Sequence, residues 1–266
     1  MGARRAILRS SDPIPGPAAS TFLARTSGLS KRERNAYINL INGLVFDGTW
    51  TLFDLLYILA TNNTTTAALN LVSTSFSLVT NGSLTFNADV GYTGDGSTGY
   101  LDTQWAPSGN GVNFTLNSAS IGAYIQSTTA SVASVVMGSA ITGTFSYMSP
   151  VNTGNVFTFN VNDNTFANFS NTNPQGAFVN TRTAITTLNI YKNGSATAVG
   201  TSAGGSTSLP TDNMILFGLN NNSAPGNFTN YQASAFFAGA GFTAAQAVTI
   251  NNRINAYMTA LGHNVY

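Results

Sequence analysis

The sequence predicts a mainly β protein, built as an antiparallel sandwich or barrel with a few helices at its two ends. From residue 73 onward, apolar residues recur with a period of two in short segments. Asn-Gly pairs and other glycine-containing turns separate these segments, and no alternation of strands with long helices appears. Charged residues make up only 7% of the 266-residue chain, while hydrophobic residues make up 43%. A neutral surface of Asn, Thr, Ser and Gly over one sizeable core fits such a fold.

Residues 1–29 are expected to form an extended, basic, proline-containing arm. Pro13, Pro15 and Pro17 favour an extended backbone. Seven of the ten basic residues lie in the first 34 positions, which carry a net charge of +5 against −4 for the rest. A basic arm on a slightly acidic body indicates contact with a partner, although a solubilising tail is the alternative. The residues assigned to anchoring are Arg4, Arg5, Arg9 and Arg25.

Residues 30–72 are expected to form a small helical cluster. Ser30 and Glu33 have the spacing of a capping box, and an apolar stripe with helical periodicity follows from Tyr37 to Val45. The segments TWTLFDLLYILA (residues 49–60) and TTTAALNLVS (residues 64–73) predict two further short helices. The apolar run LFDLLYILA has nine residues, fewer than the roughly 20 of a membrane-spanning helix.

Residues 73–266 are expected to form the sandwich and a C-terminal helix. Asn81-Gly82 and Asn193-Gly194 predict hairpin turns. Strands are expected at residues 156–163, 214–220 and 231–241. The final helix is expected to begin after Thr243 and to end at Gly262.

The stretch GYTGDGSTGYLDTQW (residues 91–105) contains Gly94, Gly96 and Gly99 in a G-x-G-x-x-G spacing. A phosphate cradle of this kind needs a helix that opens at the last glycine, whereas YLDTQW alternates as a strand does. The stretch is therefore interpreted as a turn between strands. Calcium binding by Asp89, Asp95 and Asp102 is the alternative, because calcium takes oxygen ligands. Aspartates at turns more often accept hydrogen bonds from backbone amides.

Three stretches resemble landmarks of the concanavalin A-like (laminin-G-like) jelly-roll sandwich: GYTGDGSTGYLDTQWAPS, TLNIYKNG and ASAFFAGAGFTAAQAVTINNRINAYMTALG. Together with the W-x-x-F-D-x-L-Y-x-L-A pattern at residues 50–60, they are similar to virion-associated proteins of bacteriophages and prophages. The resemblance covers about residues 45–262 and excludes the basic arm. It implies a jelly-roll fold and a place on a virion assembled in the bacterial cytoplasm.

The residues needed for catalysis are scarce. Glycoside hydrolases of this superfamily commonly use an E-x-D-x-E strand, and Glu33 is the only glutamate in the chain. Cysteine is absent and His263 is the only histidine, so thiolate or histidine-rich metal sites are excluded. We therefore expect no enzymatic activity, no cofactor and no metal.

Two functions follow as hypotheses. The first is a non-enzymatic virion structural protein, a capsid decoration, fibre or tail-associated part, anchored to other virion proteins by its arm. Such a part is expected to be a homo-oligomer, with a trimer as the guess. Nucleic acid is an unfavoured partner, because the basic groups of the arm are not interleaved with aromatic residues and the prolines between Arg9 and Arg25 split the arm. The alternative is a carbohydrate-binding module for host surface glycans, with Tyr92, Tyr100 and Trp105 as contacts and Tyr231 as a further candidate.

Overall fold

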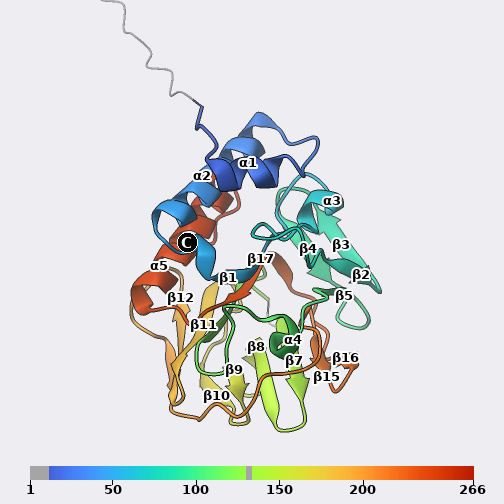
Figure 1. Ribbon diagram of the computed structural model, residues 1–266. Coiled ribbons are helices and arrows are strands. Elements are labelled where there is room, and N and C mark those ends of the chain that lie inside the picture. Colours follow the sequence, from blue (N-terminus) through green and yellow to red (C-terminus); the bar gives the residue numbers. More distant parts are fainter. Residues whose placement is uncertain (1–11, 130–133) are drawn as a thin grey trace, which may run out of the picture.

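A computed structural model describes residues 12–129 and 134–266 of the chain. Two β-sheets pack face to face, and three helices cover the other face of one sheet (Figure 1). We call the two sheets the helix-covered sheet and the outer sheet. The expected mainly β sandwich with helices near the two ends of the chain is confirmed. None of the helices within the described ranges combines the length and apolar character needed to cross a bilayer.

The strand order of both sheets is non-sequential, and all but one of the pairings are antiparallel. The helix-covered sheet runs β13 (Gly200–Ser202), β12 (Thr187–Lys192), β11 (Gly176–Ala184), β6 (Ala119–Ile125), β17 (Gln232–Gly239), β4 (Gly91–Gly94) and β3 (Leu84–Asn87), and β1 (Phe53–Ile58) also pairs with β17. The outer sheet runs β10 (Ala167–Ser170), β9 (Val156–Asp163), β8 (Thr144–Asn152), β7 (Met137–Ile141), β14 (Ile215–Leu216), β5 (Tyr100–Asp102) and β2 (Val79–Asn81), with β15 (Leu219–Asn221) and β16 (Ala224–Gly226) beside β7.

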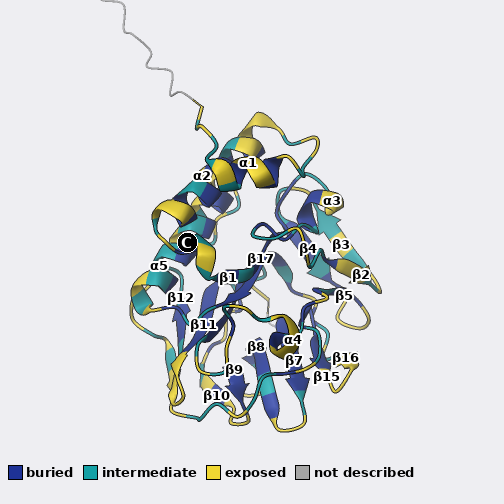
Figure 2. Cartoon of the chain, viewed as in Figure 1, coloured by how far each residue is buried: buried dark blue, intermediate teal, exposed yellow. Residues whose placement is uncertain are grey.

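The chain has two large apolar cores, one on each face of the helix-covered sheet. On β11, Phe178 faces the core between the sheets, whereas Val179 faces the helices. On β9, the alternating residues Phe157, Phe159 and Val161 fill the core between the sheets, as the sequence predicts. In Figure 2 the strands are mostly buried, and the exposed residues lie on loops and on the outward sides of the helices.

The helices form one layer over the helix-covered sheet. They are α1 (Pro17–Leu23), α2 (Lys31–Phe46) and α5 (Ala244–Leu261), and two short helices, α3 (Thr64–Ala67) and α4 (Pro107–Asn110), lie elsewhere. The capping box of Ser30 and Glu33 is confirmed at the start of α2. The expected limits of α5 are also confirmed, because the Thr243 side chain caps its first turn and Gly262 ends it with φ of 85°.

Two expectations for the N-terminal third are wrong. Residues 49–60 form a short 3₁₀ turn (Trp50–Leu52) and strand β1 instead of a helix. This strand is buried on both faces, with Tyr57 facing the other sheet and Leu56 facing the helices. Because apolar residues occupy both faces, the sequence of the strand has no periodicity that would distinguish a strand from a helix. The described part of the expected extended arm contains α1, whose residues Ala19 and Phe22 are buried against α2.

The Asn81-Gly82 turn does not close a hairpin. Gly82 has φ of 64°, as such a turn requires, but β2 pairs with β5 in the outer sheet and β3 pairs with β4 in the helix-covered sheet. The turn therefore carries the chain from one sheet to the other. The Asn193-Gly194 hairpin is confirmed by the antiparallel pairing of β12 with β13.

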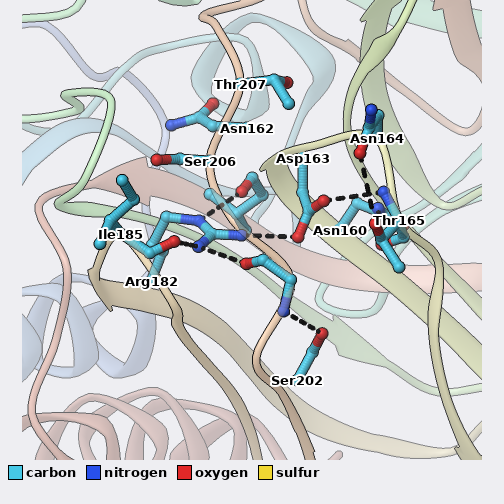
Figure 3. A network of polar contacts seen from close by, with 12 residues as sticks. Asn160, Asn162, Asp163, Asn164, Thr165, Arg182, Ile185, Ser202, Ser206 and Thr207 are labelled. Carbon is cyan, nitrogen blue, oxygen red and sulfur yellow. Dashed lines mark hydrogen bonds and ion pairs between the residues drawn. The ribbon is translucent and has the colours of Figure 1, made fainter.

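A buried ion pair links the two sheets at one end of the sandwich (Figure 3). Arg182 of β11 donates from Nη2 to Asp163 Oδ2 of β9 over 2.8 Å, and both side chains are fully buried. Arg182 Nε also donates to the carbonyl oxygen of Val161, and Nη1 donates to those of Ile185 and Gly204. A buried guanidinium with these acceptors fixes both the sheet spacing and the loops that supply the carbonyl groups.

Candidate functional site

The structure does not gather the predicted glycan contacts into a binding surface. Trp105 is 0% exposed and Tyr92 is also buried, both within the core between the sheets. Tyr100 is half-buried and stacks on Phe228, with ring centroids 6.0 Å apart. Tyr231 is fully buried in the same core. The assignment of Tyr92 and Trp105 as surface contacts is therefore wrong, because these aromatic residues fill the core.

The glycine-containing stretch is a turn organised by Asp95, as predicted. Asp95 Oδ1 accepts hydrogen bonds from the backbone amides of Ser97, Thr98 and Gly99, and Oδ2 accepts from the Ser97 and Thr98 hydroxyl groups. The Thr98 hydroxyl and these amides hold the pKa of Asp95 well below its usual range. The amides are occupied by the carboxylate of the turn itself, which leaves them unavailable to a phosphate.

The aspartates considered for calcium serve other contacts. Asp89 forms an ion pair with Arg32, and Asp102 accepts from the Gln104 amide and from Asn213. Across residues 12–129 and 134–266, no three His, Cys, Asp or Glu side chains are grouped so that they could hold a metal ion.

Arg25 contacts its own chain. Its Nη1 donates to the carbonyl oxygen of Asn70 over 2.8 Å, and its guanidinium lies 5.9 Å from the centroid of the Phe22 ring. The expectation that Arg25 belongs to a free arm is therefore wrong. The other three anchoring residues, Arg4, Arg5 and Arg9, lie outside the described residues.

A different set of aromatic residues lies on the solvent side of the outer sheet, away from the helices. Phe145 and Tyr147 of β8 and Phe166, just before β10, form a cluster with ring centroids 5.2 to 6.2 Å apart. Phe166 is 52% exposed, whereas Tyr147 is 8% exposed and supports the other two rings. We call this cluster, with the cavities beside it, the aromatic groove.

Strand register brings polar groups to the same face. Ser149 of β8 lies opposite Thr158 of β9, which lies opposite Asn168 of β10. The β8–β9 register shifts by one residue between Ser149 and Asn152, and this bulge turns Asn152 to the solvent side as well. Hydroxyl and amide side chains therefore form a row next to the aromatic rings.

The groove has two neighbouring lobes, and Tyr147, Asn152 and Phe166 line both of them. The larger lobe, of about 390 Å³, is lined by the polar row at Thr158 and Asn168. The smaller lobe, of about 190 Å³, is a recess with Val135 and Leu219 in its wall. Two adjoining lobes of this size suit a ligand of more than one small ring.

The described side chains that line the groove are uncharged. None of the described residues that line either lobe is Asp, Glu, Lys, Arg or His. Burial raises the pKa of the Tyr147 phenol well above its usual value, so this group is uncharged at physiological pH. The described residues of the groove can offer hydrogen bonds and aromatic faces, but they offer no charge to an ionic ligand.

The buried ion pair also positions the exposed ring of Phe166. Asp163 Oδ1 accepts from the amide of Thr165 over 2.7 Å, while Asn160 Nδ2 donates to the carbonyl oxygen of Thr165 over 2.6 Å (Figure 3). Both contacts hold the turn immediately before Phe166. The exposed aromatic ring is therefore carried by a turn that is tied to both sheets.

Comparisons with known proteins agree with this fold. No family model matches the chain, and no curated protein matches it. A crystallised HCR/D mutant has a TM-score of 0.51 at 8% identity, over 78% of this chain and 51% of its own. The binding domain of botulinum neurotoxin DC in complex with SialylT gives 0.42 at 13% identity, over 78% of this chain and 52% of its own. A Trypanosoma rangeli sialidase gives 0.48 at 9% identity, over 77% and 33%.

The chain spans about half the length of the first two of these structures and about a third of the sialidase. At such low identity, the likeness to the HCR/D structure concerns the arrangement of the two sheets and not the residues of a site. The chain thus shares its overall fold with the HCR/D structure.

Proposed function

We propose that this protein is a non-catalytic carbohydrate-binding module, with the aromatic groove on the outer sheet as its glycan site. The observation that carries the proposal is the cluster of Phe145, Tyr147 and Phe166 beside a row of hydroxyl and amide side chains. This lectin-like function is the alternative drawn from the sequence, transferred to different residues.

The groups of the groove match the two kinds of surface that a sugar presents. One face of a pyranose ring carries C–H groups, which pack on aromatic rings, and its rim carries hydroxyl groups. Asn168 offers two donors and an acceptor. Asn152 donates one N–H to Thr158 Oγ1 and accepts from the Thr153 amide, which leaves its second N–H and the Thr158 O–H as further donors. A concave apolar surface with a few convergent polar groups is the usual form of a small-ligand site.

The composition of the groove favours binding without hydrolysis. Most glycoside hydrolases place two carboxyl groups on either side of the scissile bond. No carboxyl group occurs among the described residues that line the two lobes. A glycan held there would contact neutral groups alone.

The virion structural function predicted from the sequence receives less support than its alternative. None of the compared structures reported above is described as a phage protein. A place on a virion, anchoring through residues 1–29 and a homo-oligomeric state stay predictions. A glycan-binding groove is compatible with them, because a virion part that contacts a cell surface needs such a site.

The Phe166→Ala variant is expected to bind glycan at least about tenfold more weakly than the unchanged protein. The substitution removes the most exposed ring of the groove, and the loss of that apolar contact corresponds to roughly 1.4 kcal/mol or more. A glycan array would first identify a ligand, and titration calorimetry would then give both dissociation constants. Because Phe166 is half-exposed, the free energy of unfolding is expected to change little.

The Phe46→Ala variant is the matched control. Phe46 is 87% exposed and ends α2, in the layer on the far side of the helix-covered sheet. It is expected to keep the original affinity. Equal affinities for the Phe166 variant and the unchanged protein would refute the proposed site, and release of reducing sugar from the ligand would refute the absence of catalysis.

A further inference from the structure

We propose that Glu33 and Asp89 share one proton, which joins the first turn of α2 to the turn between β3 and β4 and makes this contact sensitive to pH. Glu33 lies in the first turn of α2, and Asp89 lies in the turn that connects the paired strands β3 and β4. Because β3 is an edge strand, the contact ties the helix layer to one edge of the helix-covered sheet. It lies apart from the aromatic groove and does not depend on glycan binding.

Two carboxyl groups meet at this contact. Glu33 is 4% exposed, the Asp89 side chain is 23% exposed, and the two carboxyl groups are within hydrogen-bonding reach of each other. The Oδ1 atom of Asp89 is buried and accepts no hydrogen bond from any described donor. Two ionised carboxylates are both acceptors, whereas a protonated carboxyl group donates to an ionised one. A shared proton therefore gives the buried oxygen the partner that it lacks.

Backbone contacts hold the two residues at this place. The Ser30 amide donates to the Glu33 carboxylate over 2.6 Å as part of the capping box of α2. The Asp89 amide donates to the carbonyl oxygen of Thr61 over 2.9 Å, and Asp89 has a φ of 63° in its tight turn. Moving the two carboxyl groups apart therefore breaks a helix cap or displaces a turn.

The neighbouring groups do not neutralise the pair. Arg32 contacts Oδ2 of Asp89, but the Arg32 side chain is 54% exposed and lies on the solvent side. Tyr37 of α2 and Tyr257 of α5 also face the carboxyl groups, and burial raises the pKa of Tyr37 to about 12 and that of Tyr257 well above its usual value, so both phenols stay uncharged. Burial and the adjacent Glu33 carboxyl raise the pKa of Asp89, and these effects exceed the opposing effect of Arg32.

The sign of the pH dependence follows from the raised pKa of Asp89. The folded chain holds the proton more tightly than the unfolded chain does, so the pair stabilises the fold fully below the ordinary pKa of an aspartate. This contribution is lost as the pH rises through the raised pKa. Above it, two ionised carboxylates repel each other in a place that solvates them poorly, and the attachment of α2 to the turn weakens.

The Glu33→Gln variant of the full chain tests the shared proton. Glutamine serves as well as glutamate in a capping box, and its side-chain N–H can donate to Asp89 Oδ1 at every pH. The variant is expected to melt about 2–4 °C higher than the unchanged protein at pH 8, and the difference is expected to shrink towards pH 4. In carbon-13 NMR, the Asp89 carboxyl is expected to titrate above the ordinary value of 3.8 in the unchanged protein and at lower pH in the variant.

The Asp12→Asn variant is the matched control. Asp12 forms an exposed ion pair with Lys31 of the same helix, and the hydrogen bond from Lys31 lowers the pKa of Asp12. This variant is expected to show no gain in melting temperature at pH 8. A Glu33→Gln variant that melts no higher than the unchanged protein at pH 8, or whose difference from it is the same at pH 4 and pH 8, would overturn the shared proton. Titration of the Asp89 carboxyl at or below its ordinary value would overturn it as well.

Discussion

Replacing Arg182 by Met is expected to lower the free energy of unfolding by about 3–5 kcal/mol. The substitution leaves the carboxylate of Asp163 fully buried without its cation, and the carbonyl groups of Val161, Ile185 and Gly204 lose their donor. Removing one member of a buried ion pair is costly because the remaining charge stays in a medium that solvates it poorly. Urea unfolding followed by circular dichroism would measure the change.

The Arg253→Met variant tests whether burial is the cause. Arg253 forms the same kind of ion pair with Asp47, but 38% of the Arg253 side chain is exposed. Water can solvate the remaining carboxylate there, so we expect a loss of about 1 kcal/mol or less. Equal losses for the two arginine variants would contradict burial as the cause of the larger loss expected for Arg182.

Replacing Trp105 by Ala is expected to lower the free energy of unfolding by about 3–5 kcal/mol and to leave sugar affinity unchanged. Trp105 is fully buried, and its ring meets that of Phe114 edge-on at 5.4 Å. The substitution opens a cavity in the core between the sheets and removes no group that lines the groove. Urea unfolding and calorimetric titration of the folded variant would measure the two effects.

The other tryptophan of the chain provides the comparison for stability. Trp50 is only partly buried and packs at the border of the core between the helix-covered sheet and the helices, so Trp50→Ala is expected to cost less stability than Trp105→Ala. A Trp105 variant that keeps its stability but no longer binds sugar would show that the sequence-based choice of Trp105 as a glycan contact is right and the aromatic groove is wrong.

Local signals in the sequence were sufficient for much of the fold. The alternation of Phe157, Phe159 and Val161 predicted a strand with one face in the core, and the capping residues Ser30 and Thr243 marked two helix starts. Strand β1 was missed because it is buried on both faces. The pairing of β2 and β3 with different sheets was missed because a turn signal such as Asn81-Gly82 specifies the local backbone and not the partner of each strand.

The candidate site was harder to predict, because it depends on register. Phe145 and Phe166 are 21 positions apart, and the bulges of the β8–β9 pair decide which side chains share their face. The alternating Phe145 and Tyr147 within TFSYMS were the available signal, although such a pattern alone does not separate core from surface. Tyr92 and Trp105 lie in the most recognisable motif, but that motif specifies a turn and a core.

The most direct test of a glycan site on the outer sheet is amide chemical-shift mapping of the ¹⁵N-labelled chain during titration with a glycan found by array. We expect the shifts to concentrate on β8, β9 and β10, around residues 145–152 and 158–168, with affinities that match calorimetry. Shifts that concentrate instead on residues 91–105, or on the layer formed by α1, α2 and α5, would contradict the account.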